Sequence, residues 1–267
     1  MSNQIVADID IEAYERDGYT VLSGAVPPEL CNDLVEVMDA FLGVDGLETW
    51  YERPMPFLDF VPLWGHPSQW AIRQVPALHS VWSQLLGTDD LLVSLDRCRF
   101  SPPWRSSEPE PSPLHWDHDP KDPDLLHIQG AIALTDTPAG SGGFRCAPGW
   151  HHQADRWVTL PANKDGEWTT SVPEDEIDLV SMKQGDVVLW KSRLPHSNSK
   201  NESERPRYSF YVLMTPYDDE LAAELTECWR TGICQKAWRS LPGHNHAESW
   251  APVPLEDNGR RLVGLER

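Results

Sequence analysis

The segment His115-Trp116-Asp117-His118-Asp119 lies just after a proline-rich stretch that runs from Pro102 to Pro113. In an extended strand alternate side chains share a face, so His115 and Asp117 point the same way and Trp116 points the opposite way. An imidazole nitrogen and a carboxylate oxygen on one face can provide two ligands of a metal site. A surface turn rich in Asp, Pro and His would contain the same residues, so the segment alone leaves both interpretations open.

His196 is the candidate for a third metal ligand. It follows the end of a predicted strand, and Arg207 comes 11 residues later, after a polar segment that should reverse the chain. Antiparallel pairing would return Arg207 beside the cavity that His196 faces. Two histidines and one carboxylate bind Fe(II) on one side and leave other coordination positions open. The joint pattern therefore predicts a metal site made of His115, Asp117 and His196.

Arg207 and Ser209 share one face of the apolar strand that follows His196. A guanidinium fork with a neighbouring hydroxyl suits a carboxylate, which it binds through parallel, charge-assisted hydrogen bonds. Arg205 lies on the same face and is a competing candidate for this role.

Composition narrows the class of protein. The 267 residues contain 22 Lys and Arg against 42 Asp and Glu, a formal net charge of −20. Such a field repels nucleic acid and anionic membranes, so neither is an expected partner. The five cysteines are widely spread and form no C-x-x-C pair, which favours reduced thiols. No apolar run approaches a membrane span and no signal peptide is recognisable, so we expect a cytoplasmic protein.

Hydrophobic periodicity predicts helices at both ends of the chain and short strands between them. The expected helices span residues 9–17, 28–42, 77–86 and 219–229. The expected strands span residues 19–22, 91–100, 126–136, 143–147, 178–181, 186–191 and 210–214, with a long loop over 153–176.

This order of elements predicts a mainly β fold with flanking helices and a jelly-roll core, a double-stranded β-helix of the cupin type. We expect a single domain over residues 1–267. Its parts are a helical segment over about 1–90, the jelly roll over about 91–216, and a C-terminal helix and tail over 217–267.

Several further residues are candidates for a cavity. Arg97 and Arg99 share a face of the strand over residues 91–100; either one of them lines a polar cavity, or the strand is an edge strand with one solvated face. Gln129 lies on the same strand face as Ala131 and Ala133, whose small side chains leave room for a ligand.

The proline-rich loop over residues 103–114 is expected to form one wall of a substrate pocket, with Trp104 or Arg105 as a contact. A solvent-exposed insertion is the alternative. Trp116 could add an aromatic wall. His151 and His152 are adjacent and would point to opposite sides of an extended chain, so we expect both at the surface.

At these residues the chain resembles the phytanoyl-CoA dioxygenase family of Fe(II)- and 2-oxoglutarate-dependent oxygenases. The resemblance runs from about residue 9 to Met214 and includes "HWD" at residues 115–117. The other motifs that carry it are "DGYTVL" at 17–22, "ALTDTPAGSGGFRCAPGWH" at 133–151, "GDVVLW" at 185–190 and "HSNSKN" at 196–201. It departs from the family at Trp150, Asn198 and Ser101, where Ser, Ser and Lys respectively are common.

The resemblance implies a role for each site residue. His115, Asp117 and His196 would hold Fe(II), and Arg207 would bind the far carboxylate of 2-oxoglutarate, with Ser209, Gln129 and Asn198 near the cosubstrate. Fe(II), 2-oxoglutarate and O2 are the implied cofactors. Halogenating relatives lack the carboxylate ligand, so the presence of Asp117 favours hydroxylation, or a desaturation or ring rearrangement that uses the same oxidant.

We expect the substrate to be a small organic molecule of secondary or specialised metabolism, and the reaction to release succinate and CO2. The candidate substrate-binding residues are Trp104, Arg105, Trp116 and Arg97. The net charge of −20 disfavours coenzyme A, with its phosphates, as part of that substrate. A non-catalytic or zinc-holding jelly-roll binding protein is the alternative from another class.

Overall fold

The computed structural model describes residues 9–43, 51, 60–106, 110–120, 122, 127–153, 168–240 and 252–267. The helices are α1 (Ile11–Asp17), α2 (Pro28–Leu42), α4 (Pro67–Arg73), α5 (Pro76–Leu86), α7 (Asp219–Thr231) and α8 (Asp257–Leu262), with 3-10 turns η1 (Trp150–His152), η2 (Glu174–Glu176) and η3 (Lys236–Trp238). The strands are β1 (Tyr19–Leu22), β2 (Phe60–Val61), β3 (Leu91–Val93), β4 (Cys98–Ser101), β5 (His115–Trp116), β6 (Ile128–Ala133), β7 (Phe144–Cys146), β8 (Trp168–Thr169), β9 (Asp178–Leu179), β10 (Val187–Lys191), β11 (His196–Asn198) and β12 (Arg207–Pro216).

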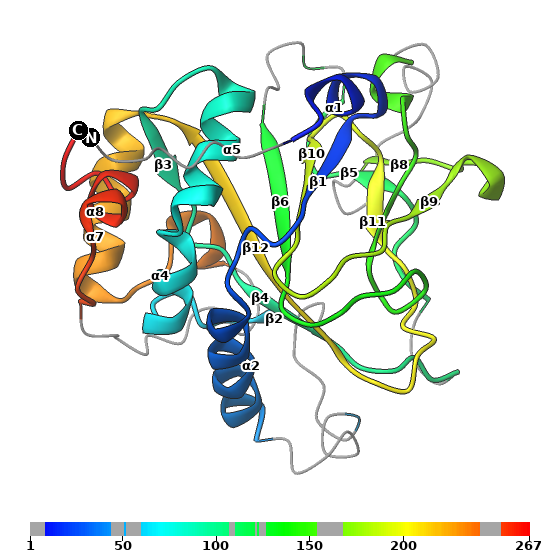
Figure 1. Ribbon diagram of the computed structural model, residues 1–267, viewed down its shortest axis with the longest axis horizontal. Coiled ribbons are helices and arrows are strands. Elements are labelled where there is room, and N and C mark those ends of the chain that lie inside the picture. The colour runs from blue at the N-terminus through cyan, green and yellow to red at the C-terminus, as the bar shows by residue number, and fades with distance from the viewer. Residues whose placement is uncertain are drawn as a thin grey trace.

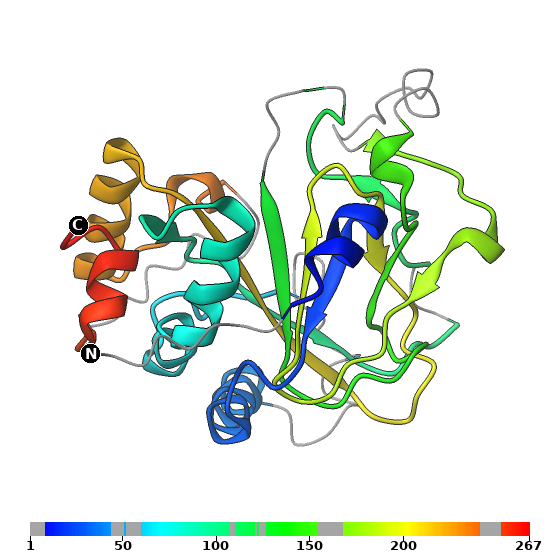
Figure 2. The same cartoon turned by 45° about the horizontal axis from the view of Figure 1, so that its top comes forward.

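Two antiparallel sheets form the centre of the molecule. The large sheet has the order β1-β10-β6-β12-β4-β2, with β3 also paired to β12, and the small sheet has the order β8-β5-β11-β7-β9. Figures 1 and 2 show the large sheet between the helices α4, α5, α7 and α8 on one side and the small sheet on the other. Two facing antiparallel sheets with flanking helices confirm the predicted jelly roll.

Alternation along β12 determines what each face of the large sheet presents. Phe210 and Val212 point into the main hydrophobic core, which they share with Trp82 of α5. Arg207, Ser209 and Tyr211 alternate with them and so lie on the opposite face, where Tyr211 packs against the apolar cluster between the sheets. The same alternation puts Gln129, Ala131 and Ala133 of β6 on that inner face, because β6 pairs directly with β12. The inner face is therefore polar at one end and lined by small residues at its centre.

The predicted strand over residues 91–100 is wrong in one respect, because it is divided into β3 and β4. Between them Ser94 bonds Leu213 in both directions, through its amide to the Leu213 carbonyl (2.8 Å) and through its hydroxyl, which accepts from the Leu213 amide (3.2 Å). Leu95 then turns its amide to the Gln235 side chain at 2.7 Å, away from the sheet. Gln235, which accepts from Leu95, lies 140 residues downstream. The break between the two strands therefore could not be predicted from the local sequence.

The other expected helices and loops agree with the structure in part. The helix from Pro28 ends, as predicted, before Gly43, which has a φ of 60°. Helix α4 was not predicted. The expected loop over residues 153–176 contains the short strand β8, which pairs with β5, and the turn η2; residues 154–167 of it lie outside the described part of the chain.

All five cysteines are buried free thiols, in agreement with the prediction that the chain has no disulfide framework. Among the helices in the described ranges, none has both the length and the apolar character needed to cross a lipid bilayer.

Gly130 tests the contact between the large sheet and α5. A Cβ atom at this position would lie 2.6 Å from Cη2 of Trp82 and 3.1 Å from the Val212 carbonyl oxygen. We expect Gly130→Ala to lower the free energy of unfolding by about 1–3 kcal/mol, the usual cost of overpacking. Chemical denaturation measures this change.

The control is the same substitution in a Trp82→Phe background. The phenyl ring is shorter than the indole and leaves room for the new methyl group, so the destabilisation by Gly130→Ala should shrink in that background. An equal loss in both backgrounds would contradict the assignment of the effect to the indole.

Candidate metal centre

The pairing of β5 with β11 brings the two predicted histidines together. His115 and His196 lie directly opposite each other in the antiparallel ladder, and their ring centroids are 5.2 Å apart. Asp117 follows His115 by two residues; its carboxylate oxygens lie 3.7 Å from Nε2 of His115 and 3.4 Å from Nε2 of His196. One ligand atom from each of the three residues fits within 4.8 Å of the others. The structure therefore gathers all three predicted ligands and presents their donor atoms to one another.

Both imidazoles are held in the tautomer that a metal requires. Nδ1 of His115 lies 3.0 Å from the Pro113 carbonyl oxygen, and Nδ1 of His196 lies 2.9 Å from the Leu194 carbonyl oxygen. A carbonyl oxygen can only accept, so each Nδ1 donates and carries the proton. In the neutral ring, the form that binds a metal, each Nε2 then carries the lone pair on the side of Asp117. Orientation of a ligating histidine by a hydrogen bond from its second nitrogen is the usual arrangement in metal sites.

Gln129 of β6 connects this group to the large sheet. Its side-chain amide donates to Oδ2 of Asp117 at 2.6 Å. Burial raises the pKa of Asp117. In the metal-free protein the hydrogen bond and charge of a protonated His196, the hydrogen bond from Gln129 and the charge of a protonated His115 lower it more, so the pKa of Asp117 lies well below the usual range. Asp117 is therefore an anion at neutral pH, as a hard cation requires.

Arg207 lies at the polar end of the inner face and is only 2% exposed. Its Nη1 donates to the Gly142 carbonyl oxygen at 2.9 Å and to Oδ1 of Asn198 at 3.1 Å. Its Nε and Nη2, and the hydroxyl of the fully buried Ser209, have no hydrogen-bond partner among the described residues. Burial lowers the pKa of Arg207 to about 10, so the side chain is still a cation at neutral pH.

This pattern of donors suits a carboxylate ligand. A guanidinium whose Nε and Nη2 point the same way binds two carboxylate oxygens in parallel, and a hydroxyl beside it can donate a third bond. The chemistry of the donor set thus matches one end of a dicarboxylic acid, with the His-Asp-His group available for the other. Arg205, the competing candidate, is exposed and precedes β12.

Tyr211 belongs to the same polar group and was not predicted. Its hydroxyl accepts from the Asn198 side-chain amide at 3.2 Å, and Asn198 in turn accepts from Arg207. The alternation that selected Arg207 and Ser209 continues to Tyr211, so its position was available from the sequence. Asn198, where the family commonly has Ser, holds Arg207 and Tyr211 in place.

The four residues predicted to contact the substrate do not form one cluster as the metal ligands do. Trp116 is fully buried on the face opposite His115, and its indole donates to the Arg193 carbonyl at 2.9 Å, the geometry of a core residue. The amide of Trp104 donates to the Asn201 carbonyl at 2.7 Å, and Lys200 lies 4.0 Å over its ring. Arg105 is exposed and stacks over Tyr51. Arg97 is buried against the rings of Phe60 and Trp238.

Four neighbouring residues with side chains able to bind metal lie outside the metal group. His118 and Asp119 are not part of the cluster found among the described residues. The prediction that His151 and His152 both lie at the surface is wrong for His151, which is 8% exposed. The chain is a 3-10 turn there rather than an extended strand, and both rings therefore approach the Glu15 carbonyl oxygen, at 3.1 and 2.8 Å.

Comparison with known proteins identifies the family. Residues 14–209 match the phytanoyl-CoA dioxygenase family. A Dictyostelium discoideum protein named for phytanoyl-CoA dioxygenase is 24% identical, with 77% of this chain and 74% of the relative covered. The Ava biosynthesis cluster protein O of Aspergillus versicolor is 23% identical, with 77% and 76% covered.

A similar solved structure is the epimerase SnoN in complex with Fe3+, alpha-ketoglutarate and nogalamycin RO. It superposes with a TM-score of 0.60 at 16% identity and covers 92% of this chain and 94% of its own. The match to the family covers most of the sequence and agrees with the fold and with the His-Asp-His group. The chain therefore belongs to the phytanoyl-CoA dioxygenase family and is an oxidoreductase that uses Fe(II), 2-oxoglutarate and O2.

Proposed function

We propose that this protein is a dioxygenase that hydroxylates a small organic molecule in specialised metabolism, with release of succinate and CO2. The observation that carries the proposal is a pair of groups that Asn198 of β11 connects, because Asn198 lies two residues after His196 and accepts from Arg207. One is the cluster of three metal-ligand side chains, and the other is a buried arginine with two unpaired donors.

In this proposal His115, Asp117 and His196 hold Fe(II) through the two Nε2 atoms and one carboxylate oxygen. The backbone bonds at both Nδ1 atoms orient the rings, and Gln129 orients the carboxylate. With O2 and 2-oxoglutarate, the bound iron supplies the oxidant for the substrate. Asp117 fills the coordination position that a halide would otherwise take, which favours hydroxylation over halogenation.

Arg207 and Ser209 bind the far carboxylate of 2-oxoglutarate. The two unpaired guanidinium donors and the unpaired hydroxyl supply as many as three hydrogen bonds to it. A buried cation that has only neutral partners is costly, and an incoming carboxylate relieves that cost. Asn198 and Tyr211 fix the guanidinium plane before the cosubstrate arrives. A zinc-holding binding protein would need the three metal ligands but not this buried arginine, so the oxygenase is the better account.

The substrate class rests on charge and on the relatives. A net charge of −20 opposes a substrate that carries several phosphates. One relative is named for a biosynthesis cluster, and SnoN was solved with nogalamycin RO. Both names favour a natural product over an acyl-coenzyme A. Trp104, at the start of the proline-rich loop, would contribute to the pocket wall.

Substitution of Asp117 tests the metal assignment. We expect Asp117→Ala to weaken Fe(II) binding by at least the ~10–100-fold that is typical for loss of an outer-shell partner, because a ligand itself is removed. The side chain is 39% exposed, so the unfolding midpoint should shift by only about 2 °C. Fe(II) affinity is measured by anaerobic titration, and folding by thermal melting.

Asp119→Ala is the matched control, two residues along the same segment. It should bind Fe(II) like the unsubstituted protein. Loss of iron in Asp119→Ala together with normal binding in Asp117→Ala would show that the wrong carboxylate has been assigned.

Substitution of Arg207 tests the cosubstrate assignment. Arg207→Lys keeps a positive charge but loses the planar fork, so the concentration of 2-oxoglutarate for half-maximal succinate formation should rise about tenfold or more. Arg205→Lys makes the same chemical change at an exposed position and should leave that concentration unchanged. A larger effect at Arg205 than at Arg207 would reject the assignment.

A further inference from the structure

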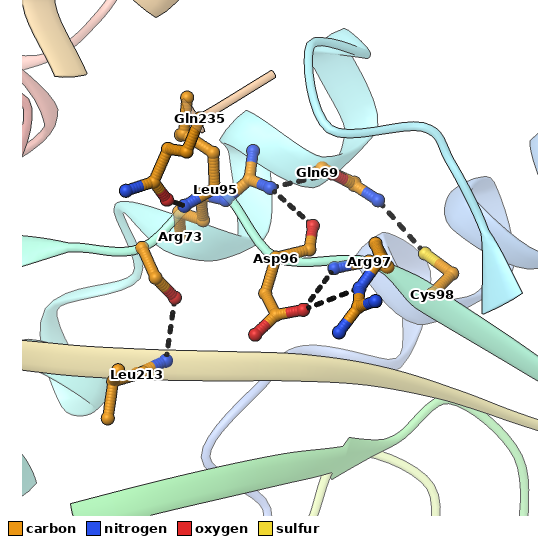
Figure 3. Close-up of polar contacts among 9 residues, drawn as sticks. Gln69, Arg73, Leu95, Asp96, Arg97, Cys98, Leu213 and Gln235 are labelled. Atoms are coloured by element: carbon orange, nitrogen blue, oxygen red, sulfur yellow. Dashed lines mark hydrogen bonds and ion pairs between the residues drawn. The ribbon is translucent and has the colours of Figure 1, made fainter. Parts of the chain in front are cut away.

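A second buried polar group lies in the segment between β3 and β4, outside the metal centre (Figure 3). Asp96 links two arginines there. Its carbonyl oxygen accepts from Nη2 of Arg73 at 3.0 Å, while its carboxylate accepts from the amide of Arg97 at 2.8 Å and from Nε of Arg97 at 3.2 Å. Figure 3 shows the two guanidinium groups on opposite sides of the segment. The two arginines therefore belong to different surroundings.

Arg73 has a structural role. Its Nη1 donates to the Trp64 carbonyl at 2.7 Å, and its Nη2 donates to Gln69 at 2.7 Å as well as to Asp96. These bonds tie α4 to the start of β4. Both terminal nitrogens of Arg73 are thus used within the fold.

Arg97 is held differently and keeps a free donor. Its guanidinium carbon lies 4.1 Å from the centre of the Phe60 ring and 4.0 Å from the Trp238 indole. The residue is 7% exposed, yet its Nη1 has no hydrogen-bond partner among the described residues, and neither does Nε1 of Trp238. Two buried N–H donors on touching side chains thus find no acceptor in the described part of the chain, which costs free energy unless a ligand or water supplies one.

The position of Trp238 is fixed by the fold. It ends the turn η3, and Gln235, just before that turn, accepts from the Leu95 amide at 2.7 Å. Figure 3 shows this contact beside the segment that carries Arg97. The C-terminal part of the chain thus contributes one of these two donors, and the segment just before β4 contributes the other.

The two donors lie at the side of the inner face that carries the proposed cosubstrate site. The amide of Tyr211 donates to the Arg97 carbonyl at 3.1 Å, and the Tyr211 and Phe60 rings meet edge to face at 5.7 Å. Tyr211 also contacts Asn198, the partner of Arg207. Strand β4 is two strands away from β6, which carries Gln129, a lateral separation of about 10 Å. A small molecule can span that distance.

We propose that Nη1 of Arg97 and Nε1 of Trp238 bind a neutral carbonyl oxygen of the substrate, while the carbon to be oxidised lies at the metal centre; this inference rests on the proposed function. Both groups are donors, so the ligand atom is an acceptor, and a carbonyl oxygen has two lone pairs for two donors. Asp96 already balances the charge of Arg97 at 3.2 Å. A second carboxylate beside Asp96 would be repelled, which favours a neutral acceptor over an anion.

The aromatic rings around this pair define the rest of the ligand. Phe60, Tyr211 and Trp238 provide apolar surface next to the two donors. The substrate class is therefore a ketone, ester, lactone or amide on an apolar or aromatic skeleton.

Three small aromatic compounds of similar shape test the assignment. Acetophenone carries the carbonyl group, ethylbenzene lacks any acceptor, and benzoate is an anion. Equilibrium dialysis against the protein loaded with Fe(II) and 2-oxoglutarate under argon gives the affinity of each. The variants are Trp238→Phe and Arg97→Lys, the latter keeping a cation beside Asp96. Trp229→Phe is the matched control, because the Trp229 indole already donates to the Val253 carbonyl at 3.0 Å.

We expect the ratio of acetophenone to ethylbenzene affinity to fall about fivefold in Trp238→Phe, the effect of one neutral hydrogen bond. It should fall by at least as much in Arg97→Lys, where the donor is charged, and stay unchanged in Trp229→Phe. An unchanged ratio in both test variants, or no detectable binding of acetophenone, overturns the site. Tightest binding by benzoate overturns the choice of a neutral acceptor.

Failure of this inference is distinguishable from failure of the proposed function. The two test variants should form the Fe(II) complex of 2-oxoglutarate like the unsubstituted protein. The dialysis is repeated without metal and cosubstrate. A carbonyl preference that persists there, with no complex formed in any protein, would support the carbonyl site and reject the oxygenase. Formation of the complex in all proteins, without any preference for acetophenone over ethylbenzene, would support the oxygenase and reject the carbonyl site.

Discussion

The antiparallel pairing of β11 with β5 is the constraint on which the site depends. It places His196 opposite His115 although 80 residues separate them in the sequence. Each Nδ1 lies next to the backbone carbonyl two residues before its own histidine. Because register fixes which side chains share a face, a slip of one residue would turn one histidine away from the other. The metal group is thus specified by main-chain hydrogen bonds rather than by contacts among its own side chains.

Different functional groups lie at different positions along the inner face of the large sheet. At one end Arg207 and Ser209 present unpaired donors, and the small residues Ala131 and Ala133 lie beside them on β6. Gln129, further along β6, reaches across to Asp117 and joins the two sheets at the metal group. The outer face of the same strands carries the hydrophobic core under the helices. Strand alternation therefore lets one set of strands stabilise the fold and bind ligands at once.

Much of this arrangement was predictable from local pattern. Alternation placed Arg207 and Ser209 together, and it placed Gln129, Ala131 and Ala133 together. The bond between Gln129 and Asp117 was not predictable, because it depends on how the two sheets face each other. The contact of Arg97 with Trp238 has the same origin, since the two residues are 141 positions apart and meet only after η3 docks on the segment before β4. His151 was misplaced because a 3-10 turn, not a strand, follows Gly149.

The most direct test of the account is the visible absorption of the Fe(II)-loaded protein on anaerobic addition of 2-oxoglutarate. If the metal group and Arg207 bind the two ends of one cosubstrate molecule, a metal-to-ligand charge-transfer band appears and saturates at one equivalent per chain. It should also weaken in Arg207→Lys at the same cosubstrate concentration. Absence of the band in protein that has bound one Fe(II) per chain would contradict the account, because the metal would then be held without the chelate that the chemistry needs.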